Sequence, residues 1–187
     1  MTVTAIDPQT ALIVVDLQKG IVSRPTAHPV NEVIGHARAL ADAFRRRGLP
    51  VVLVNVVGGA PGRTEQARNL GNLPPDWTEL VPELNRQPED HTVTKRTWGA
   101  FTNTDLERYL KAQGVTQVVI VGVATSVGVE STARQAYELG FNVTLAVDAM
   151  TDMNPDTHAN SIARIFPKLG ETGTTEEIVA LLDRPSA

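Results

Sequence analysis

Short apolar runs alternate along the chain with stretches of helical periodicity. Four runs rich in Val, Ile and Leu predict strands and a shorter run predicts a fifth, at residues 10–15, 51–57, 117–123, 142–147 and 91–94. These runs show little alternation of polar and apolar positions. That pattern is typical of strands covered on both faces, as in a parallel sheet.

Apolar residues recur at helical spacing between these runs, most clearly over residues 30–47. Further helices are predicted at 105–113, 126–139 and 174–182. Two of them begin with the sequence signature of a capping box, Thr104 with Glu107 and Thr174 with Glu177. The repeated strand–helix order predicts an α/β fold, a doubly wound three-layer α/β/α sandwich.

Residues 58–90 interrupt this rhythm. They contain Pro61, Pro74, Pro75, Pro82 and Pro88 and show no sustained period. Because long irregular segments in compact domains are usually functional, we predict that this one forms a lid or an oligomer contact.

Length and composition narrow the possible functions. The 187 residues predict a single domain spanning 1–187, with the 42% hydrophobic content of an ordinary globular protein. A net charge of −4 without a basic cluster argues against nucleic acid or an anionic membrane as a partner. The absence of cysteine excludes disulfides and thiolate metal sites. With no signal-peptide pattern and no membrane-length apolar run, we expect a cytoplasmic protein.

Candidate chemistry lies at the ends of three predicted strands. Asp16 closes the first strand, Lys95 closes the short third one, and the small-residue turn 124–128 follows the fourth. The carboxyl ends of parallel strands share one edge, so a carboxylate, an ammonium group and backbone N–H donors would meet there. Such a set suits general acid–base catalysis with electrostatic support.

An alternative uses the same turn as a nucleophile elbow. Ser126 would be the nucleophile, with Asp148 or Asp152 and then His158 as its partners. His158 follows Ser126 closely in sequence, which leaves little room for the elements that normally carry such partners. Dinucleotide and P-loop motifs are absent, and the four histidines are scattered. We therefore expect neither a cofactor nor a metal site.

Three segments together resemble a known family: VVDLQ, TKRTWGAF and GVATSVGVESTARQAYELGFNVTLAVDAM. In that order and spacing they are similar to the isochorismatase-like hydrolases, also called the cysteine hydrolase superfamily. The resemblance implies a six-stranded parallel sheet and a catalytic trio at Asp16, Lys95 and position 128. It also implies a cis peptide between Val123 and Ala124, and an oxyanion nest built from the N–H groups of Ala124 and Gly128.

Position 128 departs from the family pattern because it is Gly where amidohydrolase members have Cys. Without a side chain there, no thioester intermediate can form. The chain is similar in this respect to isochorismatases that lack the Cys and cleave a vinyl ether with an Asp as the acid. The leading hypothesis is a metal-independent hydrolase of a small molecule, and the alternative is a non-catalytic member that binds a small ligand or a partner chain.

Two further differences bear on the substrate. Thr97 stands where isochorismatases have an Arg, and NVVGGAPGRTEQ offers no match to the metal ligands of nicotinamidases. Position alone suggests four pocket residues, Gln18, Trp98, Phe101 and Thr125. The resemblance also implies a homo-oligomer, either a dimer or a tetramer.

Overall fold

The computed structural model describes residues 2–66 and 73–184, which contain a six-stranded sheet whose neighbouring strands are all parallel. In sheet order the strands are β3 (His91–Lys95), β2 (Val51–Val56), β1 (Thr10–Val15), β4 (Gln117–Val123), β5 (Asn142–Thr151) and β6 (Glu171–Gly173). The α/β fold predicted from the hydrophobic pattern is therefore confirmed.

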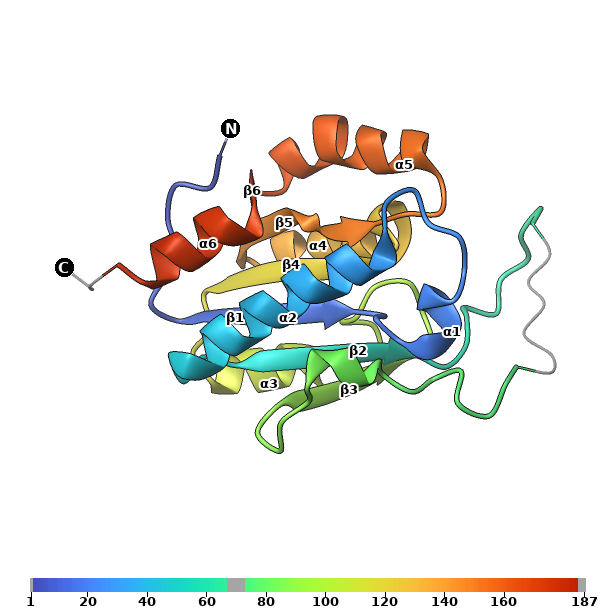
Figure 1. The fold of residues 1–187 in the computed structure, drawn as a ribbon, viewed down its shortest axis with the longest axis horizontal. Helices are drawn as coiled ribbons and strands as arrows, with labels where there is room; N and C mark the ends of the chain where they lie inside the picture. The colour runs from blue at the N-terminus through green and yellow to red at the C-terminus, as the bar shows by residue number, and fades with distance from the viewer. Residues whose placement is uncertain (1, 67–72, 185–187) are drawn as a thin grey trace.

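Helices cover both faces of the sheet, with α2 and α6 on one side and α3 and α4 on the other (Figure 1). The α-helices are α1 (Lys19–Val22), α2 (Val30–Arg46), α3 (Leu106–Ala112), α4 (Glu130–Glu138), α5 (Pro155–Asn160) and α6 (Thr175–Leu182). Shorter helical turns lie at Pro82–Leu84, Thr125–Val129, Ser161–Ile165 and Phe166–Lys168.

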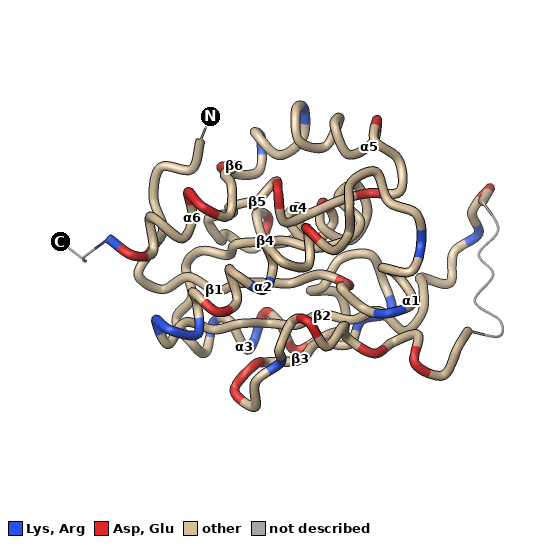
Figure 2. The backbone as a smooth tube through the Cα atoms, viewed as in Figure 1, with Lys and Arg blue, Asp and Glu red and all other residues tan. Residues whose placement is uncertain are grey.

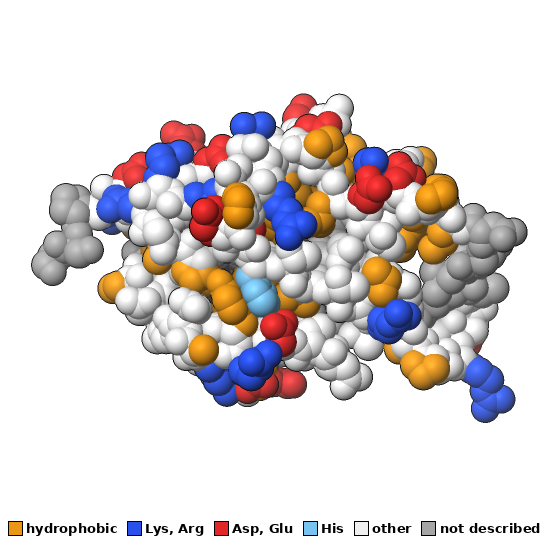
Figure 3. Space-filling view, turned by 90° about the horizontal axis from the view of Figure 1, so that it is seen from below, with side chains coloured by type: hydrophobic (Ala, Val, Ile, Leu, Met, Phe, Trp, Pro, Cys, Tyr) orange, Lys and Arg blue, Asp and Glu red, His pale blue; other side chains and the backbone are white. Residues whose placement is uncertain are grey.

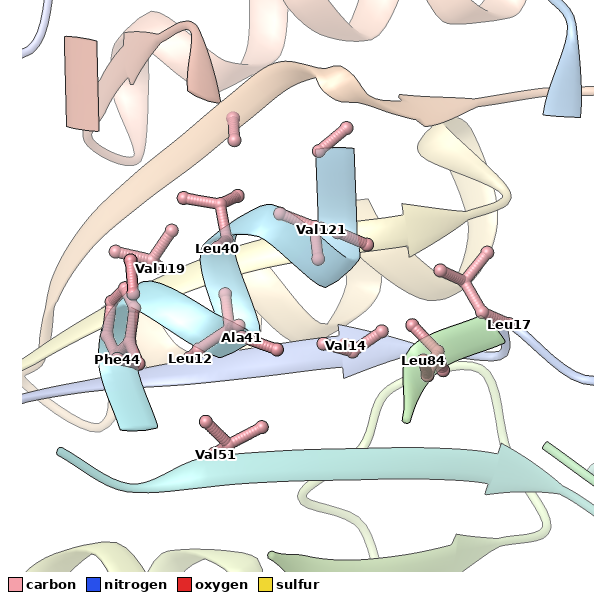
Figure 4. Packing of buried hydrophobic residues seen from close by; sticks show 14 of the residues in the cluster. Leu12, Val14, Leu17, Leu40, Ala41, Phe44, Val51, Leu84, Val119 and Val121 are labelled. Atoms are coloured by element: carbon pink, nitrogen blue, oxygen red, sulfur yellow. The ribbon is translucent and has the colours of Figure 1, made fainter. Parts of the chain in front are cut away.

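The core is divided between the two faces because successive strand residues point to opposite sides. Leu12 and Val14 of β1 pack in one cluster with Leu40 and Phe44 of α2 (Figure 4). Their neighbours in β1 belong to the second cluster, with α3 and α4: Ala11, Ile13 and Val15. Both sets are fully buried, which explains why this strand shows no polar alternation.

The predicted boundaries agree with the structure for β1 and β4, and nearly so for β2 and β3. Strand β5 continues past the predicted end at 147, because its ladder with β4 resumes after an irregularity and pairs Met150 and Thr151. The hydrophobic pattern did not predict β6, which has only three residues and no apolar run.

One of the two predicted capping boxes forms. The Thr174 hydroxyl accepts a hydrogen bond from the Glu177 N–H, and the Glu177 carboxylate accepts one from the Thr174 N–H. The other prediction is wrong, since α3 begins at Leu106 with Asp105 at its N-cap. The Thr104 hydroxyl instead accepts from the Leu106 N–H and donates to the Ala100 carbonyl.

Acidic and basic residues are spread over the helices and loops, whereas β1, β2 and β4 contain none (Figure 2). On the face shown in Figure 3, basic and acidic groups are interspersed among small groups of hydrophobic side chains. Among residues 2–66 and 73–184, no helix is both long and apolar enough to span a bilayer.

The sheet topology indicates where a ligand would bind. The chain runs outward from β1 to β2 and β3, then returns to β4 on the other side of β1. Ligand crevices of open α/β sheets lie outside the carboxyl ends of the strands at such a reversal. Helix α1 and the described residues that follow β2 both lie at this end of the sheet (Figure 1). Backbone bonds from Lys19 N to Glu79 O and from Gly20 N to Trp77 O join the two.

Candidate active site

Asp16 is the first residue after β1, and its backbone leaves the strand with a φ of 52°. Aspartate tolerates this left-handed region better than most residues do. Its N–H donates to the Val54 carbonyl, and its carbonyl accepts from the Gln18 N–H. The first bond holds the turn against β2 and the second closes the turn, so the backbone that carries the carboxylate is fixed in position. The residue is only 5% exposed.

Lys95, the last residue of β3, is buried beside Asp16. Its Nζ donates to Asp16 Oδ2 over 2.7 Å and to the carbonyls of Thr97 and Trp98 over 3.2 and 2.8 Å. An ammonium group has three donors, so these partners use its full capacity. Lys95 is therefore an electrostatic partner for Asp16, with no donor left for a ligand.

The two oxygens of Asp16 differ. Oδ2 accepts from Lys95, whereas Oδ1 is buried and has no hydrogen-bond partner among the described residues. Burial raises the pKa of Asp16 to about 6, and the nearby Lys95 partly opposes this rise. A carboxyl with this pKa can hold a proton under mildly acidic conditions and release it near neutrality. Because Lys95 occupies Oδ2, Oδ1 is the oxygen on which the proton would reside.

The turn after β4 approaches Asp16 closely. The Val123–Ala124 peptide is cis, at the position that the family resemblance implied, and a wide helical turn over Thr125–Val129 follows. A Cβ atom added to Gly128 would lie 3.2 Å from Asp16 Oδ2 and 3.0 Å from Val15 Cγ1. Any side chain at position 128 would thus project directly beside the Asp16 carboxylate.

These elements surround a cavity of about 690 Å³ at the carboxyl end of the sheet. Five of the residues singled out from the sequence line it: Asp16, Lys95, Trp98, Ala124 and Gly128. Its remaining described lining comes from α1 and the turn after it, the last residues of β2 and β4, the segment after β2 and the turns after β3, β4 and β5: Ile21, Arg24, Val56, Gly58, Gly59, Thr64, Glu65, Gln66, Trp77, Thr97, Val123, Val127 and Met153.

Comparison with known proteins is consistent with this architecture. Residues 10–177 match the isochorismatase domain. The chain belongs to the isochorismatase family. An uncharacterized isochorismatase family protein of Bacillus subtilis, YwoC, is 42% identical over 178 residues, covering 91% of this chain and 93% of that protein. A second, YecD of Escherichia coli O157:H7, is 40% identical and covers 92% of this chain and 96% of its own length.

A solved structure shows the same fold. The isochorismatase family protein of Burkholderia thailandensis superimposes with a TM-score of 0.92 at 39% identity, covering 96% of this chain and 98% of that one. The domain match and this structure confirm the family and the fold that the three segments implied. Members of the isochorismatase family are hydrolases.

Three predicted pocket residues of this isochorismatase-family chain lie outside the described cavity lining. Gln18 is fully buried; its amide nitrogen donates to the carbonyls of Val56 and Trp77, and its oxygen accepts from the Val56 N–H. Phe101 packs near Phe141, with ring centroids 6.1 Å apart. These side chains lie away from the described lining because their partners are in distant segments, which strand-end position does not reveal.

Thr125 is the third of these residues. It is fully buried, and its hydroxyl is hydrogen bonded to His158 Nδ1 over 2.8 Å. This pairing also bears on the serine-nucleophile alternative, because it directs His158 to Thr125 and not to Ser126. The Ser126 hydroxyl donates to Asp152 Oδ2 over 2.7 Å, as does the Ser126 N–H. Asp148 accepts from Thr175. The described residues therefore form no Ser–His pair in this turn.

Arg24 and Trp77 are among the lining residues that the sequence did not identify as pocket candidates. Arg24 follows α1, a helix of four residues that is too short to show a period. Trp77 lies in the segment without periodicity, and its indole packs against the backbone of Gly20. The position of Gly20 shortly after a strand-terminal Asp was the available signal for a close approach.

Proposed function

We propose that this chain hydrolyses a small molecule with Asp16 as the acid and base, with no metal ion and no covalent intermediate on residue 128. The observation that carries the proposal is the state of Asp16. Its carboxyl is buried in the wall of a cavity, has a pKa raised to about 6 and keeps Oδ1 free of protein partners among the described residues.

Lys95 would set the direction of proton transfer. Its donation to Oδ2 leaves the proton on Oδ1, and its positive charge stabilises the carboxylate that forms once the proton has moved. The N–H groups of Ala124 and Gly128 would serve as the nest for developing negative charge, since both residues line the cavity.

Hydrolysis of a vinyl ether at this site would need water as its only other reactant. Asp16 transfers its proton to the terminal CH₂ carbon, which leaves a methyl group and an oxocarbenium ion. Water adds to the cationic carbon and returns a proton to Asp16. The resulting hemiketal then breaks its C–O bond to give a ketone and an alcohol, with Asp16 again protonated. Asp16 thus first donates a proton and later accepts one, and a pKa of about 6 suits both roles near neutral pH.

The metal-independent character of the proposal is supported by the side chains present. Among the described residues, no three His, Asp or Glu side chains form a group that could hold a metal ion. The end of β2 and the residues after it supply Val56, Gly58, Gly59, Thr64, Glu65 and Gln66 to the cavity lining, without a histidine.

Hydrolysis of vinyl ethers, carboxamides and N-carbamoyl compounds, assayed with the wild type and with Asp16→Asn, tests the proposal. We expect turnover of at least one class, reduced by about a hundredfold or more in the variant, because Asn cannot donate a proton. Turnover that is unchanged in Asp16→Asn would overturn the assignment. Tight binding of a metabolite without turnover would favour the non-catalytic alternative, which Gly128 motivates.

Gly128→Cys separates the two catalytic strategies. A thiol at this position would lie beside Asp16, and the contacts of 3.0 and 3.2 Å require its neighbours to shift by a few tenths of an ångström. We expect carboxamide hydrolysis that iodoacetamide abolishes in Gly128→Cys and that is absent from Gly128→Ala. Equal activity in the two variants would show that a thiol contributes nothing here.

A further inference from the structure

The charged side chains that line the cavity differ in whether they form hydrogen bonds and ion pairs with other residues. Four charged side chains contribute to the described lining: Asp16, Arg24, Glu65 and Lys95. Asp16 and Lys95 are bonded to each other, and Lys95 donates to two carbonyls as well. The Arg24 guanidinium forms no hydrogen bond or ion pair with any described residue. It is therefore the cation whose donors are available to a ligand in the cavity.

Arg24 is carried by an anchored segment. Its N–H donates to the Ile21 carbonyl, and α1 before it is bonded through Lys19 N and Gly20 N to the segment containing Trp77. Beyond Arg24, the Ala27 N–H donates to the Asp152 carbonyl over 2.7 Å. The backbone is thus held on both sides of Arg24, which fixes the base from which its side chain reaches the cavity.

The cavity also offers aromatic surface. A Cβ atom added to Gly20 would lie 1.9 Å from Trp77 Cδ1, so the indole packs directly on this glycine. Trp98 lines the cavity while remaining 53% exposed, which is unusual for so large an apolar side chain. Ile21, Val127 and Met153 add apolar lining. Rigid indole rings provide contact area for a flat apolar ligand at little entropic cost.

We propose that the ligand of this cavity is a small carboxylate with a planar or apolar body, whose anionic group is bound by Arg24 and whose body lies against Trp77 and Trp98. A guanidinium matches a carboxylate with two parallel hydrogen bonds, a geometry that lysine cannot reproduce. The inference rests on the proposed function only in calling this ligand the substrate; the binding itself requires no turnover.

Glu65 is the residue that opposes this assignment, because its carboxylate lines the same cavity. If it recognised a cationic ligand, neutralising it would weaken binding. If Arg24 recognises an anion, neutralising Glu65 removes a repulsion and leaves binding unchanged or stronger. The variant Glu65→Gln therefore distinguishes the two signs of charge.

Benzoate and benzamide, which differ in charge but hardly in shape, test the proposal when titrated separately into the protein and followed by NMR. We expect benzoate to bind about tenfold more tightly than benzamide, as for a charge-assisted hydrogen bond. Arg24→Gln should reduce benzoate affinity to that of benzamide, and Arg24→Lys should retain only part of the difference. Arg86→Gln, which removes the same charge from an exposed site outside the described lining, should change neither affinity.

Equal affinity for the two probes, an Arg24→Gln variant that binds benzoate normally, weaker benzoate binding in Glu65→Gln, or no benzoate binding at millimolar concentration would each overturn the proposal. Its failure is distinguishable from failure of the proposed function. Unchanged turnover in Asp16→Asn would contradict the role of Asp16, while Arg24-dependent binding of benzoate would still establish the anion site.

Discussion

Two buried aspartates in this molecule each pair with a basic side chain, but the geometry of the two pairs differs. Asp90 lies before β3 and accepts from Arg45 Nε on Oδ1 and from Arg45 Nη2 and the Gln87 N–H on Oδ2. Asp16, at the carboxyl end of β1, accepts on Oδ2 from Lys95 and leaves Oδ1 buried without a partner among the described residues.

The difference separates a structural carboxylate from a reactive one. Both oxygens of Asp90 are used, and a fork-like pair with arginine fixes α2 to the loop before β3. At Asp16, burial is only partly compensated, so the carboxyl is less stable as an anion and its pKa rises to about 6. An incompletely satisfied buried group is costly, and such costs concentrate at functional sites.

The most direct test of this contrast makes the same substitution, aspartate to asparagine, in both pairs. Asp16→Asn should abolish most turnover, by about a hundredfold or more, because proton transfer is lost. Asp90→Asn should destabilise the fold by about 1–2 kcal/mol, because the part-buried Arg45 loses one charged partner and keeps Asp42, and should leave kcat nearly unchanged. Urea denaturation and steady-state kinetics on both variants measure the two effects. The contrast fails if Asp90→Asn lowers kcat as much as Asp16→Asn does.

A smaller effect is expected from removing the cation beside Asp16. Since Lys95 lowers the pKa of Asp16, Lys95→Gln should raise that pKa further. For an acid-catalysed step, activity falls as pH rises through the pKa of the acid, so this fall should move to higher pH in the variant. The pH profile of kcat/KM measures it. Lys19→Gln, which removes an exposed pair with Asp76 and Glu79, is the control and should leave the profile unchanged.

The smallest expected effects come from two glycines, one at the site and one in the scaffold. Gly20→Ala should destabilise the protein by about 1–3 kcal/mol, because the new methyl would overlap Trp77. Gly35→Ala, in α2 with no atom within 4 Å of the added Cβ, should instead stabilise it by roughly 0.5–1 kcal/mol. Urea denaturation of both variants measures whether the free energy of unfolding rises or falls in each. Stabilisation by both variants would mean that Trp77 is not packed on Gly20.

The strands and the centre of the site were predictable because both depend on local pattern. Continuous Val-rich runs identified β1 and β4, and the parallel arrangement then brought together the polar residues that close the strands, Asp16 and Lys95. Most of the helix positions followed from periodicity in the same way.

The walls of the cavity were not predictable from local pattern. The position of Gln18 close after Asp16 predicts a pocket residue, yet its amide is bonded to Val56 and Trp77, far away in sequence. Thr125 likewise pairs with His158 and is not in the described lining. The segment that contributes Trp77 has no period, so its return to α1 is set by tertiary contacts alone.

The central claim is that the Asp16 carboxyl takes up a proton near pH 6, and NMR titration of the aspartate side-chain carboxyl carbons tests it without a substrate. We predict one resonance with a midpoint near 6 that is missing from Asp16→Asn. Because this folded-state pKa lies above the ordinary aspartate pKa of 3.8, protonation favours the folded state, and that contribution should be complete below about pH 4 and lost as pH rises through about 6. An Asp16 midpoint at or below 4 would contradict the account.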